Sequence, residues 1–357
     1  MFSNREIGTL SVLAMCRDTP AEIIPIIGEE DIDVLEFFGF IRISRNNISI
    51  RVTPEGHAIL EKAGKDYPSD GQYRCDGAVL QRRLIVSRFI FWLKANGINS
   101  FIQKPALTNG ISFLPSFALR REKGRNVLGA SRFVGMLYGE KTAFACYYVT
   151  DDNDGIYPDA EQRTFSLEVL TCRKKSAVIF TGKDNYAELV YTSINSKSTA
   201  SSAESYFNAA QRFTCDVCFI PMSDIGFRQF RILNIKNYKK RIFDAVLPND
   251  WEALKGRTSD AVRKSTGEKY LVAIDGNISR LQSISGESTH VIMLSDHIKT
   301  AEKMLKGSKL ILHPVDIREI ERLLCDTDDF KYPPAPFITK EGRYLYAPVK
   351  AFGKSRR

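Results

Sequence analysis

The segment from Phe40 to Gly56 constrains the fold more than any other part of this chain. Its apolar and polar side chains alternate in two short runs, which is typical of β-strands with one buried face. The loop at residues 45–47 between them contains two asparagines, and asparagine tolerates the positive φ angles of tight hairpins. Thr53-Pro54 then offers an N-cap and a first-turn proline. We therefore predict a two-stranded hairpin followed by a helix that ends near residue 63.

Three helical patterns precede this hairpin. Residues 4–15 carry apolar side chains at helical spacing, residues 21–27 follow Pro20, and a third pattern runs from 29 to 38 and ends at a glycine. Three helices, a two-stranded wing and a closing helix form the element order of a winged helix-turn-helix domain. We expect that domain in residues 1–64.

Four further regions follow in the sequence. We expect a linker and bridging helix at 65–97, a restriction-endonuclease-like α/β core at 98–264, a C-terminal α/β extension at 265–330 and a basic, proline-containing tail at 331–357. Within the core, residues 131–137, 142–149, 164–170, 176–181 and 228–234 resemble strands. Strands and helices alternate from residue 270 onward. The predicted fold class is therefore α+β or mixed α/β.

The charge is unevenly distributed along the 357 residues. The net charge is +9, but residues 1–64 contain six Lys or Arg against ten Asp or Glu and carry about −4. Affinity for a polyanion would therefore arise mainly outside the first domain. No run of eighteen apolar residues suggests a membrane span, and the N-terminus lacks the pattern of a secretory signal. A cytoplasmic protein without a membrane partner is expected.

Clustered basic residues suggest DNA as a partner. They lie in the hairpin, at the start of the bridging helix, in a loop and beside Tyr238, and such clusters suit phosphate contacts. The candidate DNA-binding residues are Arg42, Arg45, Arg51, Arg82, Arg83, Arg120, Arg121, Lys239, Lys240 and Arg241. A solvated helix face is the alternative for each cluster taken singly.

The third helical pattern opposes a simple DNA-reading role. In a winged helix this helix enters the major groove, yet here Glu29 to Glu36 includes five carboxylates. These carboxylates would be repelled by phosphates. The alternative is a protein partner that docks on this acidic helix.

One pair of carboxylates suggests catalysis. Asp159 follows a proline, and Glu168 lies in a run that we expect to be a strand, which is how some nucleases hold Mg²⁺. Such sites place a lysine two residues after the glutamate, but here Leu170 stands there. An inactive nuclease-like core is favoured over an active one. No metal site or cofactor is predicted, with Mg²⁺ reserved for the nuclease alternative.

The four histidines are dispersed in the sequence, at positions 57, 290, 297 and 313. Dispersion gives little support to a histidine-based catalytic triad or a zinc cluster.

Three segments together resemble the replication-relaxation family, whose members are encoded by plasmids and conjugative elements. They are the wing-then-helix phrase at 50–56, the helix with a basic start at 80–86, and Pro158-Asp159 followed by the run that contains Glu168. The resemblance spans roughly residues 1–220 and implies a DNA-associated accessory factor for replication or relaxation. It also implies that Asp159 and Glu168 correspond to the acidic pair of that family.

The sequence thus predicts a non-catalytic DNA-binding accessory or regulatory factor of a mobile element. Two alternatives stay open. The first is a Mg²⁺-dependent nuclease that uses Asp159 and Glu168, and the second is a module that docks a relaxase or a coupling partner through the helix at Glu29–Glu36.

Overall fold

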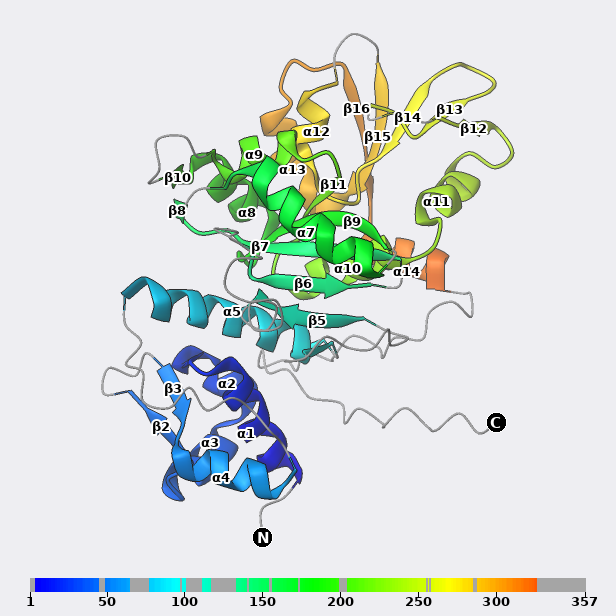
Figure 1. The fold of residues 1–357 in the computed structure, drawn as a ribbon. Coiled ribbons are helices and arrows are strands. Elements are labelled where there is room, and N and C mark those ends of the chain that lie inside the picture. Colours follow the sequence, from blue (N-terminus) through cyan, green and yellow to red (C-terminus); the bar gives the residue numbers. More distant parts are fainter. Residues whose placement is uncertain are drawn as a thin grey trace. The chain divides into compact units, whose positions relative to one another are not determined.

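The computed structural model of the chain contains two compact units, and its ribbon is drawn in Figure 1. Unit 1 consists of residues 1–106, 112–119 and 333–357, and unit 2 of residues 107–111 and 120–332. Both units mix helices with β-sheets, so the fold is mixed α+β. The structure describes residues 4–44, 49–64, 77–96, 98–100, 111–116, 133–139, 141–153, 156–172, 174–198, 204–254, 256, 258–284 and 288–325.

Unit 1 opens with three helices and a small antiparallel sheet, in blue in Figure 1. The strands pair in the order β1-β3-β2, so the short β1 extends the hairpin. The helices and the hairpin lie where the sequence predicts them. The elements are α1 (Asn4–Cys16), β1 (Thr19–Pro20), a 3₁₀ turn (Ala21–Ile23), α2 (Ile24–Ile27), α3 (Glu29–Phe37), β2 (Ile41–Ile43), β3 (Ser49–Val52) and α4 (Pro54–Lys62).

The start of α4 shows why the sequence 53–56 specifies this turn. The Thr53 hydroxyl accepts a hydrogen bond from the backbone N–H of Gly56 at 3.1 Å, which caps the helix as predicted. The backbone N–H of Thr53 donates to the carbonyl oxygen of Phe40 at 2.9 Å and fixes α4 against the hairpin. A Cβ atom on Gly56 would overlap that same carbonyl oxygen. Glycine is therefore required where α4 meets the start of β2.

A buried carboxylate joins α5 (Gly77–Ala95) to the first part of unit 1. Asp18 is 1% exposed and lies between α1 and β1. Its two oxygens pair with Arg51 of β3 and with Arg83 of α5, the latter at 2.9 Å. Ser87 of α5 also donates a hydrogen bond to the Asp18 backbone carbonyl. Because a buried anion is costly unless it is paired, this arrangement fixes β1, β3 and α5 together. Two further strands, β4 (Asn99–Ser100) and β5 (Ser112–Pro115), are parallel neighbours.

Unit 2 begins with a sheet whose strands lie in the order β11-β9-β7-β6. The β6–β7 pair is antiparallel, and β7, β9 and β11 are parallel, connected by helices. Helical crossovers cover both faces of parallel strands, which explains the nearly continuous burial of β7 and β9. The elements are β6 (Gly135–Tyr138), β7 (Thr142–Tyr148), β8 (Asp152–Asn153), α7 (Pro158–Cys172), β9 (Lys175–Thr181), α8 (Tyr186–Asn195), β10 (Lys197–Ser198), α9 (Tyr206–Arg212), β11 (Asp216–Phe219) and α10 (Asp224–Asn234).

Two strand predictions in this region were wrong. Residues 164–170 belong to helix α7, which begins at Pro158, and residues 228–234 belong to helix α10. In α7, Pro158, Glu161 and Phe165 are buried at helical spacing, and this tertiary burial outweighs the local alternation that resembled a strand. In α10, the Ser223 hydroxyl caps the helix by accepting from the Gly226 N–H, a start signal that the sequence contained.

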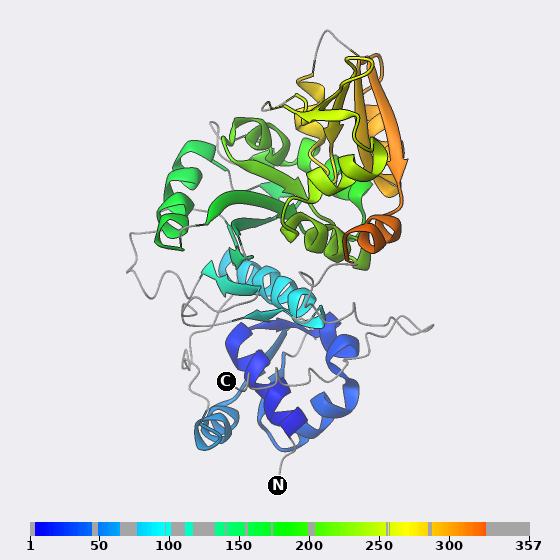
Figure 2. The ribbon, with the colours of Figure 1, turned by 90° about the vertical axis from the view of Figure 1, so that its right-hand side faces the viewer.

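The second sheet of unit 2 lies in the yellow-to-orange part of the chain (Figures 1 and 2). Its order is β12-β13-β14-β15-β16, with β14, β15 and β16 parallel. Val272, Ile292 and Leu294 on one face pack with Phe243 of α11 and Ile320 of α14. The elements are α11 (Tyr238–Val246), β12 (Trp251–Ala253), β13 (Ala261–Arg263), β14 (Lys269–Val272), α12 (Ile278–Gln282), β15 (Thr289–Leu294), α13 (Ser295–Met304), β16 (Leu310–Val315) and α14 (Ile317–Cys325).

A buried histidine is part of this packing. His297 of α13 is fully buried, and its ring stacks on Tyr186 of α8 with the ring centroids 3.6 Å apart. The Tyr186 hydroxyl donates to the carbonyl oxygen of Gly276 at 2.6 Å. Within the described residues, neither ring nitrogen of His297 has a hydrogen-bond partner. Burial therefore lowers the pKa of His297 from its usual 6.5 to about 3.

The Asp18 arrangement predicts a specific loss of stability. Replacing Arg51 and Arg83 together by methionine keeps apolar stems but leaves the Asp18 carboxylate buried without a cation. We expect the free energy of unfolding of unit 1 to fall by about 3–5 kcal/mol. Urea titration measures it through Trp92 fluorescence in a Trp251→Phe background, since the chain has two tryptophans.

The matched control is Arg88→Met, because Arg88 also belongs to α5 but pairs with Glu22, whose side chain is 61% exposed. This control is expected to cost less than about 1 kcal/mol. Equal losses in the two variants would contradict a special role for Asp18.

The low pKa of His297 predicts acid sensitivity of unit 2. As the pH falls below 6.5, the unfolded chain binds the proton first, so stability decreases until the pH reaches about 3. Relative to His297→Leu, the wild type is expected to lose about 2 kcal/mol between pH 8 and pH 5. Urea titrations at both pH values, followed through Trp251 in a Trp92→Phe background, measure this difference. The difference in unfolding free energy at pH 8 gives the packing effect of leucine alone. If the two proteins lose stability equally between pH 8 and pH 5, the low pKa of His297 is refuted.

Candidate nucleic-acid interface

The hairpin brings two of its predicted DNA-binding arginines to one face. Arg42 of β2 and Arg51 of β3 are directly opposed in the antiparallel register, so their side chains leave the sheet on the same side. Arg42 is exposed. Arg51 is half-buried and its guanidinium pairs with Asp18, so its main contact is structural. Arg45 lies outside the described residues.

The two adjacent arginines at the start of α5 have different surroundings. Arg82 is exposed, whereas Arg83 is turned inward and pairs with Asp18. Both arginines were predicted to contact DNA because they are adjacent in the sequence. On a helix, however, neighbours are separated by about 100° around the axis. Arg120 and Arg121 lie outside the described residues.

The cluster at 239–241 at the start of α11 is partly used within unit 2. The Lys239 ammonium pairs with Asp260 at 2.7 Å, and Asp260 also accepts from the backbone N–H of Val272 at 2.9 Å. Arg241 donates to the carbonyl oxygen of Leu324 at 3.1 Å. Lys240 is exposed, and so is Lys236 just before the helix. These two lysines are the members of this basic run that the structure leaves directed to solvent.

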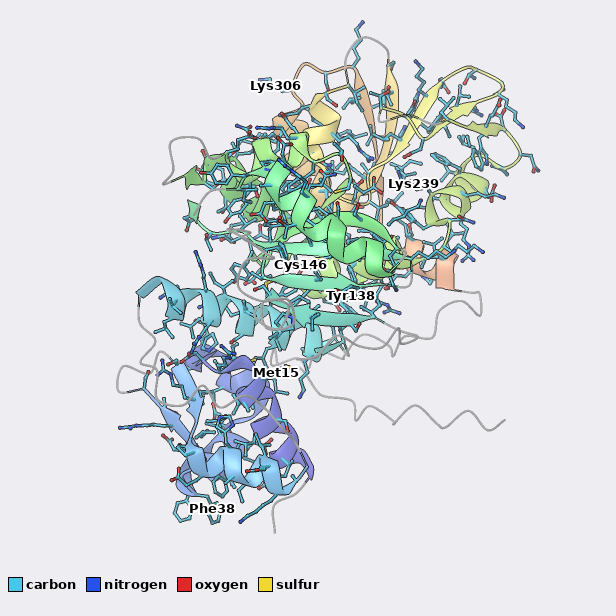
Figure 3. All side chains as sticks on the ribbon, in the orientation of Figure 1. Met15, Phe38, Tyr138, Cys146, Lys239 and Lys306 are labelled. Carbon is cyan, nitrogen blue, oxygen red and sulfur yellow. The ribbon has the colours of Figure 1, made fainter. Side chains whose placement is uncertain are left out.

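The exposed side of α3 is acidic and aromatic. Glu29, Glu30, Asp33 and Glu36 are exposed, whereas Asp31 is buried and accepts a hydrogen bond from the Thr9 hydroxyl at 3.3 Å. Phe37 and Phe38, at the end of the helix, are 84% and 54% exposed. Figure 3 shows Phe38 at the edge of unit 1, pointing away from it. The sequence revealed the carboxylates of this helix but not the exposure of Phe37 and Phe38.

The two positions proposed for a nuclease site lie on one helix and not on two strands. Asp159 and Glu168 both belong to α7, nine residues apart. Nine residues of α-helix span roughly 13 Å and place the two positions on about opposite sides of the axis. Asp159 is exposed and pairs with Arg212 of α9 at 2.8 Å. The strand geometry on which the Mg²⁺ site was predicted is therefore replaced by a helix.

Two histidines that are 23 residues apart in the sequence meet on neighbouring strands. The parallel β15–β16 register brings His290 Nδ1 to 2.8 Å from His313 Nε2, and the His290 ring stacks on Tyr270. Burial, followed by the proximity of His290, lowers the pKa of His313. The histidines are dispersed in the sequence, but the parallel strand register brings these two together. The two rings also stack on each other, with the centroids 5.0 Å apart.

Within the described residues, no group of three or more His, Cys, Asp or Glu side chains is arranged to hold a metal ion. None of the helices described is both long enough and apolar enough to cross a membrane.

No family model, curated protein or solved structure matches this chain.

The helix α7 gives a direct expectation for catalysis. Supercoiled plasmid incubated with the protein and Mg²⁺ should stay intact, because Asp159 and Glu168 are too far apart along α7 to hold one ion. Gel electrophoresis of the plasmid over time measures this, with Glu168→Ala as the matched variant. Nicking that depends on Mg²⁺ and disappears in Glu168→Ala would restore the nuclease alternative.

Proposed function

We propose that this chain is a non-catalytic DNA-binding accessory factor with an N-terminal winged helix-turn-helix domain. The observation that carries the proposal is the arrangement of α1 to α4 around the sheet β1-β3-β2. Three helices followed by a hairpin wing, with a short strand paired to it, are typical of winged-helix DNA-binding domains. Fold alone does not specify function, so the choice of DNA rests additionally on the exposed basic side chains.

The wing is the proposed contact of this domain. Arg42 is exposed on the hairpin, on the same face as Arg51. The exposed carboxylates of α3 would face phosphates if that helix entered the major groove, which costs electrostatic free energy. Contact through the wing avoids this repulsion and uses the phosphate backbone or the minor groove.

The rest of the positive charge lies outside the first domain. Residues 1–64 carry about −4 of the total +9, so residues 65–357 carry about +13. Arg82, Lys236 and Lys240 are exposed members of the basic clusters. We propose that these residues add contacts to phosphates that are independent of base sequence. Lys239 and Arg241 are better explained by their contacts within unit 2.

The resemblance to the replication-relaxation family supplies the proposed biological setting, an accessory role in a plasmid or conjugative element. The nuclease-like core proposed for residues 98–264 is supported by the antiparallel β6–β7 pair followed by the α7 crossover to the parallel strand β9. In this proposal that core serves as a scaffold.

The proposal predicts a salt dependence that responds to specific lysines. The equilibrium constant for a fluorescent duplex and for a single strand is measured by anisotropy from low to moderate salt. In the combined variant Arg42→Ala, Lys236→Ala and Lys240→Ala, the slope of log K against log salt should decrease by about 0.9 for each lost phosphate contact on duplex DNA.

The control variant is Lys299→Ala with Lys303→Ala, which removes two exposed lysines of α13 that lie outside the proposed clusters. This control should keep the wild-type slope. Absence of binding at low salt, or equal slopes in all three proteins, would rule out the proposed interface.

A further inference from the structure

The most conspicuous surface of unit 1 is the exposed side of α3, which we name the α3 face. It consists of Glu29, Glu30, Asp33, Glu36 and Phe37, all exposed. At about 100° per residue these five positions lie within about 120° of the helix circumference, while Ile32 and Leu35 point to the core. The surface therefore combines negative charge with a large apolar side chain.

Two further phenylalanines adjoin Phe37 on this side of unit 1. The rings of Phe37 and Phe38 meet edge to face with the centroids 5.3 Å apart, and Phe38 stacks with Phe40 at 6.0 Å. Single exposed hydrophobic residues are ordinary, but adjoining exposed aromatic rings are typical of contact surfaces. Phe37, at 84% exposure, keeps most of its apolar area in water.

The charged part has no counter-charge in the described parts of the chain. There, none of the carboxylates Glu29, Glu30, Asp33 and Glu36 forms an ion pair or a side-chain hydrogen bond. A second copy of this acidic face would be repelled, and so would DNA. The complementary partner is a basic polypeptide that also carries aromatic or aliphatic side chains.

The chain itself contains such a polypeptide. Residues 331–357 include seven Lys or Arg against one Glu, together with five aromatic residues. This segment follows Cys325, where the described part of the chain ends. About 25 extended residues can span roughly 80 Å, so the segment has a long reach. Covalent attachment also raises the local concentration of the segment to the millimolar range.

We propose that the C-terminal segment, residues 331–357, binds the α3 face of its own chain. Its lysines and arginines pair with the carboxylates of α3, and an aromatic side chain covers Phe37. The bound segment removes the exposed aromatic surface from water and neutralises the acidic helix. This inference is independent of DNA binding, and its test contains no DNA.

The first experiment maps the contact in the full-length protein. A carbodiimide couples lysines directly to carboxylates, and mass spectrometry of the digested monomer identifies the joined peptides. We expect Lys331, Lys340, Lys350 or Lys354 to be joined to the peptide that contains Glu29–Glu36. The yield should be independent of protein concentration and should fall at high salt. Absence of these links, or a yield that rises with concentration because two chains are joined, would overturn the proposal.

The second experiment measures protection of the segment from protease. In the full-length protein, trypsin cleavage after Arg343 should be about fivefold faster in the variant Glu30→Lys, Asp33→Lys, Phe37→Ser than in the wild type, since cleavage requires release of the segment. The matched control is Glu302→Lys with Tyr191→Ser, which changes an exposed carboxylate and an exposed aromatic residue of unit 2. Equal cleavage rates in all three proteins would refute the contact.

A separate measurement checks that the α3 variant folds. Unfolding of unit 1, followed through Trp92 in a Trp251→Phe background, verifies that the α3 variant is folded. If it is not, Phe37→Ser alone replaces it, because Phe37 contributes little buried surface to the fold at 84% exposure. The single variant is expected to speed cleavage by about twofold to threefold, and an unchanged rate would count against the proposal.

Discussion

The buried carboxylate of Asp18 is the constraint on which unit 1 depends. An anion with 1% exposure has almost no water to solvate it, so its oxygens must be paired within the protein. Arg51 from β3 and Arg83 from α5 supply that pairing. The hairpin and the long helix are thereby held to the same point between α1 and β1. These two arginines had been predicted to bind DNA, but both form ion pairs with the buried Asp18 carboxylate.

A similar division of basic residues is found in unit 2. Lys239 pairs with Asp260, while its neighbour Lys240 is exposed. In both units, one of two adjacent basic residues forms an ion pair within the fold, and the other is exposed. The exposed members Arg42, Arg82, Lys236 and Lys240 therefore define the proposed interface better than the clusters themselves. This reasoning also explains why a high net charge alone overstates the charge available to DNA.

The face of α3 limits what the proposed winged-helix domain can do. Its core side is apolar, through Ile32 and Leu35, as the fold requires. Its outer side has carboxylates and exposed phenylalanines instead of the cations that a groove-reading helix presents. Wing contact with DNA and docking of a basic segment on α3 are compatible, because they use different surfaces of the domain. The carboxylates of α7 contribute to neither proposal.

The sequence by itself determined the elements whose signals are local. The alternation in β2 and β3, the Thr53 cap and the helical spacing in α1 and α5 identified these elements of unit 1. The β/α alternation after residue 270 identified the strands β14, β15 and β16 of unit 2. Tertiary structure decided the rest, because burial and pairing join residues that are distant in the chain. Residues 164–170 alternate locally like a strand, but they belong to helix α7, in which Glu161 and Phe165 are buried at helical spacing. Strand register joined His290 to His313, and burial of Asp18 selected Arg51 and Arg83 from 33 and 65 residues away. A local sequence pattern cannot predict such contacts, because they form only when distant helices and strands pack together.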